Sequence, residues 1–347
     1  MVRMRDPNLL RFAFGLLMLA VAGCLATRGN VYPLSEGYLP AEGVFARCQR
    51  ISALAPELVR LHIIGFSGTE HLPIYALEIG TPQAGRNVLL VGQHHGDEVL
   101  GIEIVLDWAE ELAVRGSKDK QLSEILSQFR FWIVPSINPE GHRVVSSGLQ
   151  QFKRKNNRET TGDGKLDLRA DGVDLNRNYP VFWDEDLALP PTHQNFKGTA
   201  PASEPEVQAI VGLAQKHSFE LAMFYHSSPT GELSEKIFLP ALDSLNTRQK
   251  LRWQTTKSLA DKYASNLKRD YQDGTYAVSP VPGTRVGNAR NYFFHIREAY
   301  AFLIEVGGVT PDGISIVHPP AKMRDRIVAR HLKALRKLFA YNLMTLV

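Results

Sequence analysis

The chain has little cysteine and little excess charge, and its amino-terminal apolar run is short. Only two cysteines occur in 347 residues, so a disulfide framework cannot define the fold. The formal net charge is +4, and half of that excess lies in the first 23 residues. The remainder is too small for a nucleic-acid-binding surface. The apolar run at residues 12–22 is shorter than a membrane-spanning helix requires.

What is present suits one enzyme-sized domain. Hydrophobic residues make up 44% of the chain, enough to bury a large core, and no internal repeat is visible. Length alone would allow two domains, but the motifs described below span most of the chain. We therefore predict one catalytic domain over residues 45–347. The sequence contains no signal for an oligomeric state.

Residues 1–24 are typical of a targeting segment. Three arginines precede the apolar run, which has the length of a signal-peptide core. The run leads into Val-Ala-Gly-Cys24, which resembles the lipobox of bacterial lipoproteins, where the cysteine is lipidated and becomes the first residue. An ordinary signal peptide with a chance cysteine is the alternative.

Lipidation of Cys24 would place the protein in the bacterial cell envelope, because acyl chains anchor a protein to a membrane. Leu25, rather than an aspartate, follows the cysteine; by analogy with such lipoproteins, this favours the periplasmic side of the outer membrane if the source is Gram-negative. Residues 25–44 show no clear period and are predicted to form a tether, followed by a short helix over residues 45–58. Cys48 then has no disulfide partner, and we expect a buried thiol.

A candidate metal site begins where an apolar run ends at Gly92. The run predicts a buried strand, and the amphipathic pattern after it predicts a helix from residue 98 to about 114. His95 and Glu98 on this turn can direct a nitrogen and a carboxylate at one ion, and zinc accepts such mixed ligands. His94 competes with His95, but the spacing to Glu98 favours His95. Asp97 is expected to cap the helix.

Two further candidate site residues also lie in apolar runs that predict buried strands. His226 ends the apolar run at residues 221–226, and Glu305 lies in the apolar run that begins at Ala301. Strand ends gather at one edge of an open α/β sheet, where ligands bind. We therefore expect both side chains to lie near His95 and Glu98.

Taken in order, these motifs resemble those of the zinc carboxypeptidases of the funnelin type. The resemblance covers about residues 67–308 and implies an α/β/α sandwich around a mixed, largely parallel, eight-stranded twisted sheet, with one zinc ion and a peptide substrate. The matching motifs are His95-x-x-Glu98, Arg154-Lys155, Asp174-x-Asn176-Arg177, Ser203-Glu-Pro-Glu206, His226-Ser227 and the strand residue Glu305.

The resemblance assigns the chemical roles. It makes His95, Glu98 and His226 the zinc ligands and leaves the ion one water to activate. Glu305 becomes the general base that takes a proton and returns it to the leaving amine. Asp174 accepts the outer N–H of a zinc-bound histidine and fixes its orientation.

Arg154 matches the arginine that stabilises the oxyanion, with Lys155 and Arg158 as nearby alternatives. The resemblance also implies that Asn176 and Arg177 bind the terminal carboxylate of the substrate, since a guanidinium suits bidentate capture.

The tyrosine that closes over the substrate is predicted to be Tyr276, with Tyr271 and Tyr292 as rivals. The pocket for the leaving residue is expected in residues 280–288, where Arg285 is the visible charge. If Arg285 faces the pocket, it would favour a leaving group with an additional carboxylate, such as diaminopimelate. A solvent-facing arginine is the open alternative.

Two other segments have plainer interpretations. Residues 162–167 hint at a calcium loop but lack its further ligands, so we predict a glycine-rich turn. Residues 322–337 predict a terminal helix with a solvated basic face, with contact to anionic lipid headgroups as the alternative.

The sequence therefore predicts zinc-dependent hydrolysis of a peptide bond at or near a carboxyl terminus, with cell-wall (peptidoglycan) peptides as the natural substrate. An amidase or deacylase of the aspartoacylase type, which shares the metal core, is one alternative. A non-catalytic envelope lipoprotein that binds peptides is the other.

Overall fold

The computed structural model describes residues 34, 37–185, 189–242, 245–271, 273–279 and 284–340. At its centre the described strands form one eight-stranded sheet in the order β1-β2-β4-β3-β5-β8-β6-β7. The strands are β1 (Val59–Phe66), β2 (Pro73–Ile79), β3 (Arg86–Val91), β4 (Phe129–Val134), β5 (Phe219–His226), β6 (Lys236–Phe238), β7 (Ala277–Ser279) and β8 (Tyr300–Glu305).

The central strands β4, β3, β5 and β8 run parallel to one another. Antiparallel pairs join β1 and β2 to one side of this block and β6 to the other. Buried parallel strands read as continuous apolar runs, which is why the sequence revealed β3, β5 and β8. The predicted mixed, largely parallel sheet is confirmed.

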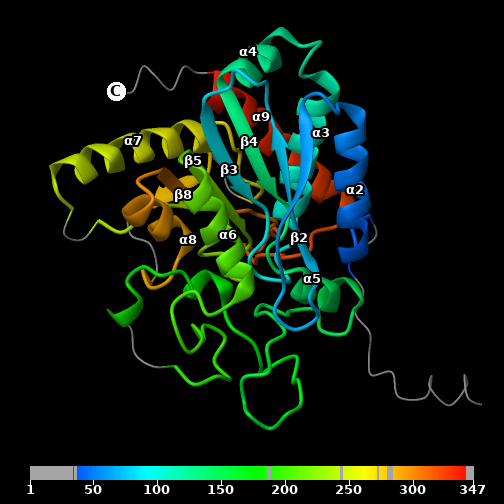
Figure 1. Ribbon diagram of the computed structural model, residues 1–347, viewed down its shortest axis with the longest axis vertical. Coiled ribbons are helices and arrows are strands. Elements are labelled where there is room, and N and C mark those ends of the chain that lie inside the picture. The colour runs from blue at the N-terminus through cyan, green and yellow to red at the C-terminus, as the bar shows by residue number, and fades with distance from the viewer. Residues whose placement is uncertain are drawn as a thin grey trace, which may run out of the picture.

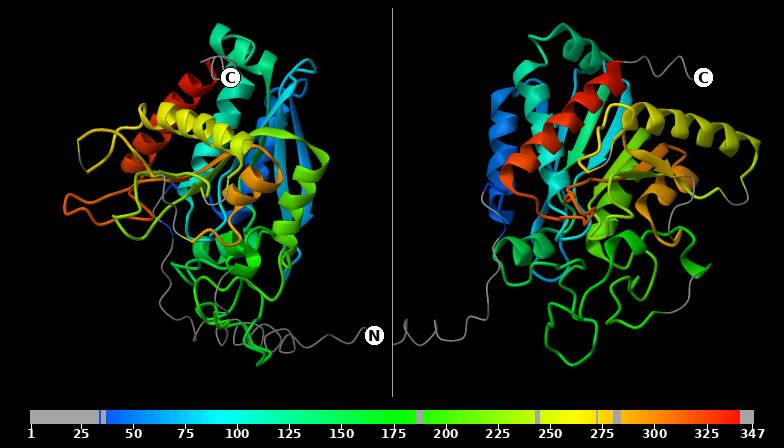
Figure 2. Two further views of the ribbon diagram at one scale, coloured as in Figure 1. Left: turned by 90° about the vertical axis from the view of Figure 1, so that its left-hand side faces the viewer. Right: turned by 180° about the vertical axis from the view of Figure 1, so that it is seen from behind.

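Helices cover both faces and complete the α/β/α sandwich (Figure 1). In Figure 1 α6 lies in front of the sheet, and the rear view in Figure 2 shows α2, α7 and α9 on the opposite side. Within the described residues, no helix is both long and apolar enough to span a membrane. The helices are α2 (Ala41–Leu54), α3 (Leu100–Arg115), α4 (Lys120–Gln128), α5 (Pro139–Ser146), α6 (Pro205–Lys216), α7 (Thr247–Ala264), the short α8 (Ala289–Asn291) and α9 (Ala321–Ala340).

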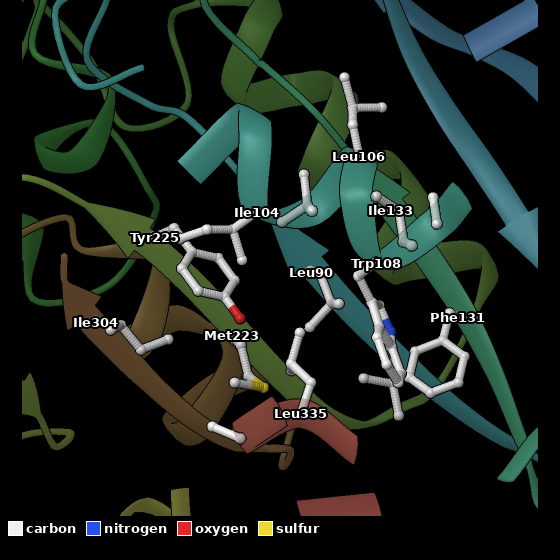
Figure 3. Packing of buried hydrophobic residues seen from close by; sticks show 14 of the residues in the cluster. Leu90, Ile104, Leu106, Trp108, Phe131, Ile133, Met223, Tyr225, Ile304 and Leu335 are labelled. Carbon is white, nitrogen blue, oxygen red and sulfur yellow. The ribbon is translucent and has the colours of Figure 1, made fainter. Parts of the chain in front are cut away.

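The larger core cluster holds the strand ends in place. Figure 3 shows Leu90 of β3 and Met223 of β5 between the β8 residue Ile304 on one side and Trp108 of α3 on the other, with Leu335 of α9 beside them. All five side chains are fully buried. Close packing of this kind resists small displacements, so the edge where β3, β5 and β8 end is a firm platform.

The turn after β3 differs from the predicted one. Helix α3 begins at Leu100, its N-cap residue is Val99, and no side chain caps it. The prediction that Asp97 caps the helix is therefore wrong. The turn is instead held by the close approach of α3 to the sheet. A Cβ added at Gly101 would lie 2.0 Å from the carbonyl oxygen of Gly92, which only glycine permits.

The amino-terminal boundary also differs. Helix α2 spans Ala41–Leu54 rather than residues 45–58. Tyr38 is buried and donates its hydroxyl hydrogen to the carbonyl of Pro319 (2.8 Å), while the backbone N–H of Leu39 donates to Glu103. The described end of the predicted tether therefore belongs to the domain. Residues 1–24, with Cys24, lie outside the described residues.

Cys48 is fully buried, as predicted, and forms no disulfide with any of the described residues. The segment at residues 162–167 is part of a turn closed by its own hydrogen bonds, in which Asp171 accepts from the backbone of Thr160, Thr161 and Asp167. This agrees with a turn rather than a calcium loop.

Helix α9 confirms the predicted terminal helix, but its basic face is not simply solvated. Arg326 and Arg330 both pair with Asp270, and Arg336 pairs with Glu111. These ion pairs use three of its cations to dock the helix on the domain, which weakens the lipid-headgroup alternative.

A buried glutamate at the start of α6 makes stability depend on pH. Glu206 accepts a hydrogen bond from the backbone N–H of Gly68 (3.1 Å), but its Oε2 has no partner in the described structure. Burial is the main cause that raises its pKa to about 7, and the carboxylates of Glu204 and Glu140 add to the shift. The folded state therefore keeps a proton that an unfolded chain loses near its ordinary pKa of 4.5.

Because the folded pKa is raised, the contribution of this group to stability falls as pH increases from about 4.5 to about 7. In Glu206→Gln this pH-dependent loss of stability, up to about 3 kcal/mol, should be absent. The free energy of unfolding of the variant, relative to that of the wild type, should therefore rise between pH 5 and pH 8. Urea unfolding of both proteins with a metal chelator present measures the difference. Glu124→Gln, at an exposed glutamate of α4, should follow the wild type; parallel profiles for Glu206→Gln would contradict the expectation.

Candidate metal centre and active site

A cavity of about 590 Å³ opens at the carboxyl ends of β3, β5 and β8. The long irregular connection between α5 and α6 lies at this edge, below the sheet in the view of Figure 1. Besides the strand ends, segments around residues 152–154, 176–177, 194–195, 228–233 and 284–290 contribute to the lining. The position agrees with the general rule that ligands bind beyond the carboxyl ends of parallel strands.

Three ligand atoms converge inside this cavity. His95 Nδ1 lies 2.8 Å from Glu98 Oε1, and His226 Nδ1 lies 2.8 Å from Glu98 Oε2 and 3.2 Å from His95 Nδ1. A tetrahedral zinc ion with bonds near 2.05 Å separates its ligand atoms by about 3.3 Å, so small outward shifts would admit the ion. All three residues are buried, and together they could hold a metal ion.

His94 is directed elsewhere. Its Nε2 lies 3.0 Å from the hydroxyl oxygen of Tyr179, and its ring stacks on His226 with centroids 5.2 Å apart. It is therefore a packing neighbour of the three-residue group rather than a member of it.

The charges around the three ligands compensate one another. Burial and Arg154 lower the pKa of His95, but Glu98 and Asp174 outweigh them and raise it to about 9. For Glu98, burial opposes ionisation, yet the two histidines hold its pKa well below the ordinary value. Burial lowers the pKa of His226 to about 4. A metal ion would therefore meet an ionised carboxylate and a neutral His226, and it would displace a proton from His95.

Asp174 connects the metal ligands to Arg154. Its Oδ1 lies 3.0 Å from His95 Nε2, while its Oδ2 accepts hydrogen bonds from Arg154 Nε (3.1 Å) and Nη2 (2.7 Å). Asp174 is fully buried, and such a carboxylate fixes the direction and tautomer of a ligating histidine.

Arg154 is the basic residue of its segment that reaches the site, and its Nη1 lies 3.1 Å from His95 Nδ1. The two alternatives are occupied elsewhere. Lys155 donates to the carbonyls of Ala170 (2.5 Å) and Pro191 (2.7 Å), and Arg158 pairs with Glu204.

Glu305 ends β8 beside His226, its partner in the β5–β8 register. Its side chain lines the cavity, and its buried Oε2 has no hydrogen-bond partner in the described structure. Burial, followed by the Glu98 carboxylate, raises its pKa to about 8. A cation among the three ligands would favour its ionised form.

Asn176 and Arg177 both line the cavity. The amide nitrogen of Asn176 lies 3.3 Å from His226 Nε2, and its Oδ1 accepts the backbone N–H of Ala289 (2.9 Å). Arg177 donates from Nη1 to the carbonyl of Asn176 (2.8 Å). Asn176 therefore also helps to position a candidate metal ligand.

The assignment of Tyr276 as the closing tyrosine is wrong. Tyr276 is buried in the core against His331, and its hydroxyl oxygen accepts the backbone N–H of Gly307 (2.9 Å). Of its rivals, Tyr292 packs on Tyr179. In the described part of the chain, no tyrosine lines the cavity.

The placement of Arg285 in the pocket is also wrong. Its guanidinium pairs with Glu185 and lies over the ring of Phe182, 5.0 Å from the centroid. It is not among the residues that line the cavity, whereas its neighbour Thr284 and the buried Arg290 are. Sequence reasoning missed Arg290 because it lies two residues beyond the segment expected to form the pocket, in a helix too short to show a period.

Comparison with known proteins shows which family has this site. A family model described as zinc carboxypeptidase matches residues 45–328. The chain belongs to the zinc carboxypeptidase family. Since the family binds one zinc ion and the three-residue group can hold it, the predicted cofactor is confirmed.

Among curated relatives, the chain is 27% identical over 200 residues to carboxypeptidase A6 of Mus musculus, covering 56% of this chain and 44% of the relative. It is 23% identical over 319 residues to a protein of Ajellomyces capsulatus named inactive metallocarboxypeptidase ECM14, covering 80% and 51%. The chain thus spans about half the length of these relatives.

Among solved structures, the carboxypeptidase A of Helicoverpa armigera is similar, with a TM-score of 0.72 at 18% identity over 96% of this chain and 81% of that one. At this identity the likeness establishes the fold alone. It agrees with the α/β/α sandwich described above.

The contact between Asp174 and His95 generates a test of the metal centre. We expect Asp174→Asn to weaken zinc binding by about 10- to 100-fold, because an amide no longer compensates the ligating histidine. Competition with a fluorescent zinc chelator measures the affinity. Asp163→Asn, at an exposed loop aspartate, serves as the matched control; an unchanged affinity in Asp174→Asn would show that Asp174 does not support the site.

Proposed function

We propose that the protein is a zinc-dependent carboxypeptidase that hydrolyses the peptide bond before the carboxyl-terminal residue of its substrate. The single observation that carries the proposal is the convergence of His95, Glu98, His226 and Glu305 in one cavity. Family membership supports the same reaction.

When bound, zinc supplies Lewis acidity, which lowers the pKa of a water molecule and polarises the scissile carbonyl. Glu305 is the general base, because its side chain lines the cavity that the ligands share and its Oε2 has no hydrogen-bond partner in the described structure. It accepts a proton from the attacking water and delivers it to the leaving amine as the C–N bond breaks.

The other side chains bind and orient the substrate. Arg154 is held by Asp174 at the metal group, and a fixed cation there stabilises the negative charge that develops on the carbonyl oxygen. Arg177, with Asn176 beside it, binds the terminal carboxylate of the peptide. This carboxylate contact restricts hydrolysis to the last peptide bond.

Two other functions share parts of this site. A deacylase of the aspartoacylase type would use the same metal core, but the family match is to carboxypeptidases. A non-catalytic peptide-binding protein is suggested by relatives that are named inactive. Against that alternative, this chain has all three ligand side chains and Glu305 in place.

Replacement of the general base tests catalysis directly. Glu305→Gln should lower kcat/KM for acylated dipeptides by about 10³-fold, because the amide cannot accept the proton, while zinc content stays at the wild-type level. Glu220→Gln, at the opposite end of β5, is the matched control. Chelation should abolish wild-type activity and zinc should restore it.

Assays on peptides, N-acyl amino acids and muropeptides, with products identified by mass, separate the alternatives. Hydrolysis of N-acyl amino acids alone would favour the deacylase. Full activity in Glu305→Gln would show that Glu305 is not the general base. A zinc-loaded wild type that cleaves none of the substrates would favour the non-catalytic, peptide-binding function.

We also propose that the protein is a lipoprotein of the bacterial envelope that acts on cell-wall peptides. The support is the lipobox-like sequence before Cys24 and the apolar run that precedes it. In a bacterial host, wild-type protein should incorporate labelled fatty acid and fractionate with membranes. Cys24→Ala should lose the label, because its thiol is the acceptor, whereas Cys48→Ala should retain it. Equal labelling of wild type and Cys24→Ala would reject the lipid anchor.

A further inference from the structure

The cavity contains a cation to which the mechanism above gives no role. Arg290, in the short helix α8, is only 4% exposed and lines the cavity together with Phe238, Leu303 and Glu305. Its Nε donates to the backbone carbonyl of Leu239 (3.0 Å). This bond orients the guanidinium, and its two terminal nitrogens donate no hydrogen bond to any of the described residues.

Arg290 has no carboxylate within ion-pair distance among the described residues, in contrast to three other arginines. Arg154 pairs with Asp174 and Arg86 pairs with Glu220, while Arg285 on the neighbouring loop pairs with Glu185. A buried charge is costly unless it is paired. An unpaired guanidinium that lines a cavity is therefore suited to an anion that arrives with a ligand.

The surroundings define the shape of that ligand. Phe238 and Leu303 supply apolar wall beside the guanidinium, which suits the methylene groups of a side chain. Arg177 in the same cavity is the candidate partner for the terminal carboxylate. Burial, with a smaller contribution from Arg177, lowers the pKa of Arg290 to about 9 although the Glu305 carboxylate acts in the opposite direction, so Arg290 remains a cation at neutral pH.

We infer that Arg290 is a specificity-determining residue that binds a carboxylate on the side chain of the leaving residue. The inference rests on the proposed function and adds its substrate class: peptides that end in an acidic amino acid. Glutamate and diaminopimelate both carry such a second carboxylate. Glutamate can be the last residue of an ordinary peptide, whereas diaminopimelate occurs in cell-wall peptides.

The sharpest comparison uses two acylated dipeptides that differ only in charge, one ending in glutamate and the other in glutamine. We expect wild-type kcat/KM to be about 100-fold higher for the glutamate substrate, or roughly 2.8 kcal/mol at 1.4 kcal/mol per tenfold. In Arg290→Ala this ratio should approach one. Arg285→Ala, which removes the ion-paired arginine outside the cavity, should keep the wild-type ratio.

A second measurement does not depend on catalysis. Calorimetric titration of the metal-free protein with free glutamate and free glutamine should show tighter binding of glutamate in the wild type and in Arg285→Ala, but equal binding in Arg290→Ala. If Arg290→Ala does not fold, Arg290→Gln keeps a polar, hydrogen-bonding side chain without the charge and should show the same loss. Substrates ending in diaminopimelate then distinguish cell-wall peptides from peptides ending in glutamate.

The outcomes separate the two proposals. A protein that cleaves no peptide yet binds glutamate through Arg290 would overturn the carboxypeptidase function and keep the anion site. A wild type that cleaves both substrates equally, or an Arg290 variant that keeps the preference, would overturn the specificity role and keep the hydrolytic function.

Discussion

The active site depends on the register of β5 against its two parallel neighbours. His226 pairs with Glu305, so β5 and β8 end level with each other, while Val91 at the end of β3 pairs with Phe224. The turn after β3 then carries His95 to the same edge of the sheet. A slip of one residue would turn each side chain to the other face. The apolar side chains between α3, α9 and the sheet oppose such a slip (Figure 3). Hydrophobic packing therefore places the chemical groups without touching the substrate.

Packing alone cannot keep so many charges inside the protein. Glu98 and Asp174 are buried carboxylates, and each is stable there because cationic or donor groups face it. Asp174 contacts His95 and Arg154 at the same time, so a candidate metal ligand and the proposed oxyanion-binding arginine share one anchor. One consequence is that a defect at Asp174 affects both metal binding and transition-state stabilisation.

The sequence predicted the part of the site that follows from strand ends. The apolar runs before Gly92, His226 and Glu305 are local patterns, and the rule for parallel strands brings their ends together. Arg285 and Tyr276 lie in segments without a period, where distant partners decide direction. Glu185 draws Arg285 away from the cavity, and the backbone of Gly307 holds the hydroxyl of Tyr276 in the core. No local pattern contains that information.

The same division separates catalysis from selectivity in this structure. The metal ligands and Glu305 sit on or directly after buried strands, whereas most of the remaining cavity wall comes from the irregular connection between α5 and α6 and from residues 284–290. Irregular segments generally tolerate sequence change better than a buried sheet does, although Ala289 of the second segment is packed into the core. A chain of this family can therefore keep the metal group and exchange the residue that meets the leaving side chain. In the specificity proposal, Arg290 is such a residue: its Nε is held by the backbone carbonyl of Leu239, and it forms no ion pair with any of the described residues.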